Sequence, residues 1–155
     1  MMGRSLLVVG SLATIGLVVS AVLAYMGQPF TQHLLTALVA SLLLLFSHCW
    51  IMFYLIGTGK VIKETVAKEG LAPELYEQTK GFKNRSYPWM MLAMGLAMAT
   101  FIIGGGVHTN VIPAWVHHAL FWITLAAQVY TLWIELEVLS ANESLMAGIE
   151  RQLAE

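Results

Sequence analysis

Four long runs of apolar residues dominate the pattern of hydrophobic and polar positions along the chain. A hydrocarbon layer about 30 Å thick requires roughly 20 apolar residues in a helix. The runs lack the alternation of membrane barrel strands, and backbone groups that face lipid must be hydrogen-bonded within their own helix. The pattern therefore predicts an all-α, integral membrane four-helix bundle. No charged residue interrupts any of its expected spans, which cover residues 6–26, 31–58, 88–103 and 114–134.

The composition agrees with this fold class. The chain has 155 residues, which is the length of a single domain, so residues 1–155 are expected to form one four-span unit. Charged residues make up 11% of it, against about 25% in soluble domains. A net charge of −1 gives no indication of a nucleic-acid partner. The single cysteine, Cys49, excludes an internal disulfide.

Lysine and arginine predict the orientation of the spans. The segment 60–86 holds six basic residues, whereas the connections 27–31 and 104–113 hold none. Because basic residues accumulate on the cytoplasmic side of membrane proteins, we expect both termini and the 60–86 loop to be cytoplasmic, in a multi-pass protein of a bacterial inner membrane. The first run is longer than the core of a signal peptide, about 7–15 residues, and is expected to remain as a helix.

Glycine, proline and serine residues predict where the helices between the second and third spans begin and end. Gly70 is a natural end for the second helix, and Pro73 suits the first turn of a short helix that reaches about Thr79. Ser86 is expected to be the N-cap of the third span, with Pro88 in its first turn.

The second and fourth helices are both predicted to extend beyond the membrane, the fourth as a helical tail over residues 135–155. The two extensions leave on the same side, so their charged residues can face one another. Two interpretations remain open, namely solvated helix faces or a docking stalk for another subunit. The residues concerned are Lys60, Lys63 and Lys68 on one helix and Glu137, Glu143 and Glu150 on the other.

Small residues recur along one side of the first span. Such spacing lets helices approach closely in lipid, within one bundle or between subunits. The stripe consists of Ala13, Gly16, Ser20 and Ala24.

The fourth span carries a polar seam. Its members are spaced by seven, four, three and four residues, so they share one helical face, and polar groups in a span normally face the protein interior. His118 is turned about 100° away from this face, toward a surface with Trp122 and Val129. The inward seam is predicted to be His117, Thr124, Gln128, Thr131 and Glu135.

The depth of the five histidines suggests a cofactor site. His33 and His117 lie at matching depth near the outer ends of two parallel helices, and neutral imidazole suits haem iron, copper and zinc. His48 lies about 22 Å deeper than His33 and is a candidate ligand for a second, inner haem, for which Met90, Met91 and Met94 are candidate partners. The candidate cofactor ligands are therefore His33, His117, His48 and His118, and the candidate metal ligands are His33, His117 and His108.

This layout resembles the general plan of four-helix membrane cytochromes b. The leading hypothesis is a small redox-type membrane subunit that binds haem b or a metal near the outer face, within a larger electron-transfer complex or a self-associated assembly. The alternatives are a cofactor-free scaffold subunit, whose histidines only form hydrogen bonds, and a proton or ion pathway through Gln128 and Glu135. No metalloprotease motif or nucleophile elbow is present, so an intrinsic hydrolase activity has no support.

Overall fold

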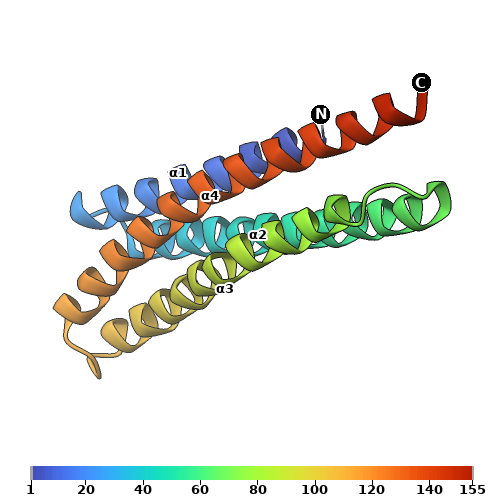
Figure 1. The fold of residues 1–155 in the computed structure, drawn as a ribbon. Coiled ribbons are helices and arrows are strands. Elements are labelled where there is room, and N and C mark those ends of the chain that lie inside the picture. The colour runs from blue at the N-terminus through green and yellow to red at the C-terminus, as the bar shows by residue number, and fades with distance from the viewer. Residues whose placement is uncertain (1, 155) are drawn as a thin grey trace.

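The computed structural model describes residues 2–154, and the side chains of residues 5–154. Every element within this range is a helix, which confirms the all-α prediction. Each of the four helices is long and apolar enough to cross a membrane, and large apolar side chains such as Leu12, Phe53 and Trp133 are exposed on their surfaces. These features suggest a membrane protein. The helices are α1 (Met2–Tyr25), α2 (Phe30–Glu69), α3 (Glu74–His108) and α4 (Ala114–Ala154) (Figure 1).

The helices form two hairpins, α1–α2 and α3–α4, which pack side by side (Figure 1). The turns at residues 26–29 and 109–113 lie together at what we call the turn end of the bundle. The α2–α3 connection at residues 70–73 lies at the opposite end, the loop end, toward which both chain termini point. α1 contacts α2 and α4, and α3 also contacts α2 and α4, so α2 and α4 face each other diagonally.

Small residues bring α1 and α2 into close contact, as the stripe on the first span predicts. A Cβ added to Gly16 would lie 2.9 Å from the Cβ of Ala40, and a Cβ added to Gly10 would lie 2.9 Å from Ser47 Oγ. Ala13, between these two glycines, is fully buried. A larger residue at Gly16 would push the two helices apart, because an added Cβ there would also lie 3.6 Å from the Ala40 Cα.

Apolar contacts hold the extended helices together at the loop end. Ile62 of α2 and Leu145 and Ile149 of α4 form a buried cluster, which α3 covers with Leu75 and Phe82. Two of the three lysines of α2 instead form ion pairs within their own helix, Lys60 with Glu64 at 3.8 Å and Lys68 with Glu69 at 3.1 Å. The third, Lys63, lies over the Tyr76 ring of α3, 5.8 Å from its centroid.

The predicted break before the third span is wrong. α3 begins at Glu74 and passes through Pro88 as one helix, so most of the segment 60–86 is helical rather than an irregular loop. Ser86 is not an N-cap, because its hydroxyl donates to the Phe82 carbonyl one turn back, at 2.8 Å. Proline removes one helical hydrogen bond, and the continuous buried face from Thr79 to Met90 offsets that loss. Gly70 ends α2 with φ 66°, as predicted.

Candidate functional site

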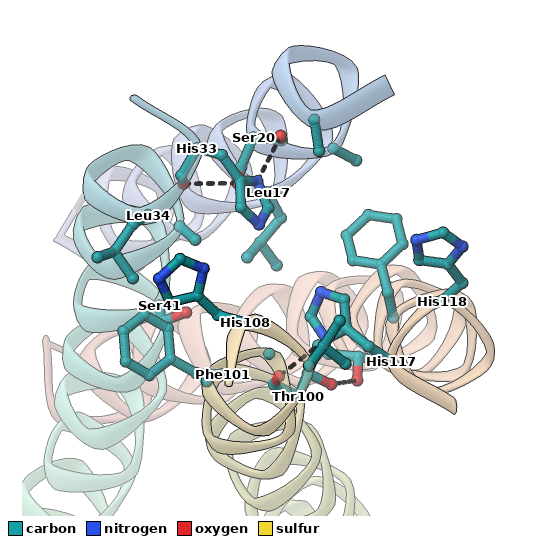
Figure 2. Close-up of a pocket in the computed structure, with 18 of the residues that line it drawn as sticks. Leu17, Ser20, His33, Leu34, Ser41, Thr100, Phe101, His108, His117 and His118 are labelled. Carbon is teal, nitrogen blue, oxygen red and sulfur yellow. Dashed lines mark hydrogen bonds between the residues drawn. The ribbon is translucent and has the colours of Figure 1, made fainter. Parts of the chain in front are cut away.

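A cavity of about 310 Å³ lies inside the turn end of the bundle, and all four helices contribute to its wall. Much of the wall is made of small or aliphatic residues, including Ala21, Ala24, Ala37, Gly104 and Gly105. Four of the five histidines of the chain also line it (Figure 2). The cavity therefore brings together four of the histidines that the sequence names as candidate ligands, namely His33, His108, His117 and His118.

His33 of α2 is held by Ser20 of α1. Its Nδ1 donates to the Ser20 backbone carbonyl at 2.9 Å, and the Ser20 hydroxyl lies 2.9 Å from the same nitrogen and donates to the His33 carbonyl at 3.1 Å. A carbonyl can only accept a hydrogen bond, so Nδ1 carries the ring proton. The other nitrogen, Nε2, then presents a lone pair.

His117 of α4 is held by α3 in a similar way. Its Nδ1 donates to the Thr100 carbonyl at 3.1 Å, which again leaves the lone pair on Nε2. The Cε1 edge of the imidazole approaches Gly104, where an added Cβ would be 3.0 Å from the Cε1 atom. Below the ring, the hydroxyls of Thr100 and Thr124 are hydrogen-bonded at 2.6 Å.

The His33 and His117 rings face each other across the cavity (Figure 2). Their centroids are 6.4 Å apart and their planes are nearly perpendicular, at 84°. Two bonds of about 2.0–2.1 Å to one metal atom, together with the two ring radii, span about 6 to 6.5 Å when the ligands lie opposite each other. A tetrahedral arrangement would bring the centroids to about 5 Å. The spacing thus fits two opposed ligands of one metal centre.

His108 and His118 occupy the rim of the cavity, and both are exposed. His108 stacks on Phe30 with a centroid distance of 3.8 Å, and His118 lies 5.5 Å from the Tyr25 ring. Within the described part of the chain, no group of three or more His, Cys, Asp or Glu side chains is arranged to hold a metal ion. The His33–His117 pair is therefore the feature with ligand geometry.

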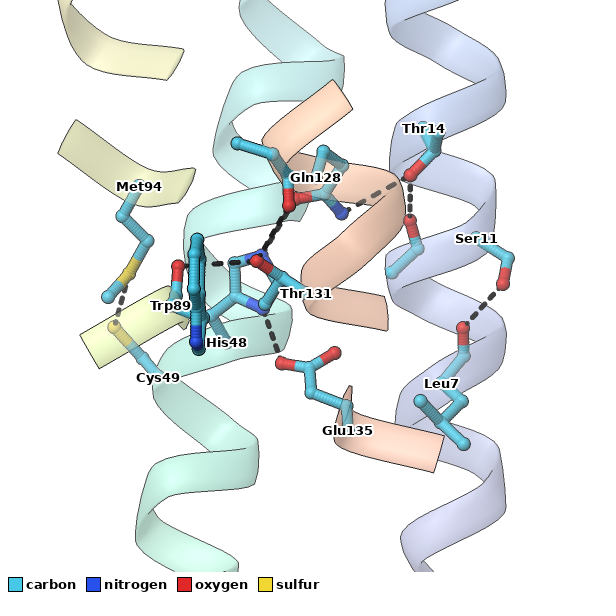
Figure 3. Close-up of polar contacts among 12 residues, drawn as sticks. Leu7, Ser11, Thr14, His48, Cys49, Trp89, Met94, Gln128, Thr131 and Glu135 are labelled. Carbon is cyan, nitrogen blue, oxygen red and sulfur yellow. Dashed lines mark hydrogen bonds and ion pairs between the residues drawn. The ribbon is translucent and has the colours of Figure 1, made fainter. Parts of the chain in front are cut away.

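His48 has a different environment, in the middle of the bundle (Figure 3). Its Nδ1 lies 2.6 Å from Glu135 Oε1 and its Nε2 lies 2.9 Å from Gln128 Oε1. Both ring nitrogens are thus engaged, and none is left for an inner haem. Met94 contacts Cys49, at 3.8 Å between the sulfur atoms, and Met90 packs in the apolar core.

The predicted inward seam of α4 is confirmed over most of its length. Thr124 is 2% exposed, and Gln128, Thr131 and Glu135 are fully buried. His117, at the turn-end limit of the seam, is half-buried and faces the cavity. A single helical face of α4 therefore links the cavity to the His48 site.

The sequence did not predict the role of three residues that position the histidines. Ser20 lies in the small-residue stripe, where a hydroxyl among alanines and glycines is the available signal. Thr100 acts through its backbone carbonyl, which has no sequence signal. Gly104 lies in a run of three glycines, and only the contact with the His117 ring distinguishes it from Gly105.

The turn-end cavity thus combines two imidazoles with free Nε2 atoms, fixed tautomers and a spacing suited to one metal centre between them. No protein-family model, no curated protein and no solved structure matches this chain. Its function must be inferred from its own residues.

Proposed function

We propose that this protein is a small membrane redox subunit that binds one haem b in the turn-end cavity, where His33 and His117 would hold it. The observation that carries the proposal is the opposition of the two rings at 6.4 Å, with both Nδ1 atoms bound to backbone carbonyls. A histidine that ligates a metal through one nitrogen usually donates its other N–H to a carbonyl or carboxylate, which fixes the ring and raises its basicity.

The lining of the cavity is suited to the flat apolar ring of a porphyrin. Its volume of about 310 Å³ falls at the lower end of the range for small-molecule sites, about 300–1,000 Å³. Alanines and glycines on three helices leave room beside the axis that joins the two imidazoles. Haem bound there would supply one-electron chemistry, while Ser20 and Thr100 hold the rings and the apolar walls exclude water.

A haem explains this arrangement better than a metal ion held by the protein alone. A structural zinc site needs four ligands in a tetrahedron, whereas the described side chains offer two opposed imidazoles and no third ligand. A purely structural role for the histidines would not require both Nε2 atoms to face one hollow.

We further propose that the four helices cross a bacterial inner membrane, with the loop end in the cytoplasm. The basic residues of the segment 60–86 lie toward that end and the two turns lack any, as the positive-inside rule requires. The haem would then lie near the outer face, where a larger electron-transfer complex can reach it. Reporter fusions at the C-terminus and in the 109–113 turn would test this orientation, and a C-terminal fusion active outside the cell would contradict it.

The absorption spectrum of the protein purified from membranes after haem supplementation tests the cofactor assignment. We expect a Soret band that is lost in both His33→Ala and His117→Ala. His118→Ala is the matched control, because this neighbouring histidine is exposed at the rim and should leave the band in place. A colourless wild-type protein that is folded and fails to take up added haem would favour a scaffold role instead.

A further inference from the structure

The hydrogen bonds around His48 have a defined direction. The Thr14 hydroxyl donates to the Gly10 carbonyl at 2.9 Å, so it accepts from Gln128 Nε2 at 3.2 Å. The amide of Gln128 is thereby oriented with its oxygen toward His48 Nε2, at 2.9 Å. An amide oxygen only accepts, so His48 Nε2 carries a hydrogen.

One proton then remains to be placed between His48 Nδ1 and Glu135 Oε1, which are 2.6 Å apart. With this proton the pair has no net charge, whether it exists as imidazolium and carboxylate or as two neutral groups. Both side chains are fully buried. Glu135 Oε2 has no hydrogen-bond partner within the described side chains of residues 5–154, and neither has Ser47 Oγ on α2.

We propose that the His48–Glu135 pair is a buried proton-exchange site, in which Glu135 Oε2 takes up one proton when an electron enters the turn-end cavity. The source of that electron rests on the proposed function. The proton site itself rests on the pairing of the two side chains and on the free carboxylate oxygen.

Charge balance gives the reason for coupling. One electron from a one-electron reductant adds a negative charge to an apolar bundle, where charges interact more strongly than in water. One proton from the water at the loop end, forming an O–H bond at Glu135 Oε2, restores the original net charge. The two sites share the buried face of α4, since Thr124 lines the cavity and Gln128, one turn further, contacts His48.

A second buried polar side chain lies on α4 between Glu135 and the loop end. Asn142 lies two turns beyond Glu135 on the same buried face of α4, and it accepts a hydrogen bond from Thr58 at 3.3 Å. Its Nδ2 atom, like Glu135 Oε2, has no partner in the described chain. Proteins commonly satisfy such buried polar atoms with ordered water.

No other described group competes with Glu135 for this role. Its carboxyl is the one fully buried acid among residues 5–154. Across residues 5–25 of α1 the only titratable side chain is Tyr25, at the turn end. The titratable groups of α2 on this side are His48 and, nearer the loop end, Tyr54. α3 presents Tyr87, whose hydroxyl donates to the Met52 carbonyl at 2.9 Å, and Arg85, which pairs with Glu137 of α4.

Redox titration of the haem-loaded protein at several pH values tests the coupling. We expect the equilibrium constant for reduction to fall as the pH rises, by up to tenfold per unit in the wild type, because one proton accompanies each electron. In Glu135→Gln this dependence should disappear. Glu137→Gln is the matched control, an exposed acid of the same helix, and should behave as the wild type. A wild-type protein whose reduction does not depend on pH would overturn the proposal, as would a dependence retained in Glu135→Gln.

Infrared titration separates failure of this inference from failure of the haem assignment. If the wild type binds no haem, the proposed function fails, but the same protein can still be titrated with acid. We expect the band of a buried carboxylic acid without a hydrogen-bond partner to grow as the pH falls, in the wild type and in Glu137→Gln but not in Glu135→Gln. Absence of that band from the folded wild type would overturn the proton site, and this readout also serves if Glu135→Gln is poorly folded.

Discussion

The histidines at the turn end and the histidine in the middle of the bundle differ in what their ring nitrogens touch. His33 and His117 each bind a backbone carbonyl through Nδ1 and present Nε2 to a cavity. His48 binds oxygen atoms through both nitrogens and is fully buried. The first environment suits a guest ligand, whereas the second is complete and suits a fixed polar link between α2 and α4. The number of free ring nitrogens therefore separates these two roles.

The largest expected effect is on stability, at the middle of the bundle. His48→Ala leaves the buried Glu135 carboxyl without its partner, and breaking such a pair costs about 3–5 kcal/mol. Denaturant unfolding in detergent, followed by circular dichroism, measures this loss. The exposed His118→Ala should change stability by less than about 0.5 kcal/mol. Equal effects of the two variants would remove the distinction between the two regions.

A paired substitution sharpens the same contrast. Replacing both His48 and Glu135 with leucine removes the buried polar groups together, and such replacements are often neutral or stabilising. We expect the double variant to recover most of the stability lost in His48→Ala, because neither group is left unpaired. If the double variant is as unstable as His48→Ala, the hydrogen bond between His48 and Glu135 must stabilise the bundle by more than pairing these two buried groups.

The next effect is on haem affinity at the turn end. In Gly104→Ala the new methyl group would lie 3.0 Å from His117 Cε1 and displace a ring that Thr100 holds in place. We expect haem affinity to fall about tenfold or more, as for other changes behind a ligand, while helix stability is unchanged or increased. Gly95→Ala is the matched control on the same helix, since nothing lies within 4 Å of its added Cβ. Haem titration followed at the Soret band measures both, and equal affinities would argue against His117 as a ligand.

A smaller effect is expected from Ser20→Ala. This change removes the hydroxyl beside His33 but keeps the Ser20 carbonyl that accepts from Nδ1 at 2.9 Å. Loss of one hydrogen bond is worth about 1 kcal/mol, which corresponds to about a fivefold weaker affinity for haem. Ser11→Ala, an exposed serine of α1 bonded only to its own helix, provides the comparison.

The smallest effect is expected at an exposed ion pair. Arg85 and Glu137 join α3 to α4, but their side chains are 60% and 38% exposed. Pairs of this kind contribute about 0–1 kcal/mol because water screens them. Arg85→Ala should therefore lower the unfolding free energy far less than His48→Ala does, and a comparable loss would mean that burial is not what separates the two pairs.

Much of the fold could be predicted because the apolar runs are long and uncharged. The presence of four long apolar helices and the end of α2 at Gly70 follow from local rules of length and backbone conformation. The continuation of α3 through Pro88 does not. It depends on a buried face shared with α2 and α4, whose contribution no local signal at Ser86 or Pro88 reveals.

For the candidate site, the helical periodicity of the sequence predicts which residues share a face of one helix, but not which residues on different helices meet. Spacing along α4 places His117, Thr124, Gln128 and Glu135 on one inward face, and the structure agrees for the buried members. The pairing of His48 with Glu135 joins residues 87 positions apart. No periodic pattern within a single helix indicates which acid will meet which imidazole, so the sequence left His48 as a candidate ligand.

His33 and His117 belong to different hairpins, and this has a consequence for biosynthesis. The first hairpin is complete when residue 69 has been made, yet it supplies only one of the two imidazoles. A ligand bound by both rings would link the first hairpin to the second, which is synthesised later. Cofactor loading should therefore follow insertion of the second hairpin, and a truncated chain that ends before α4 should retain none.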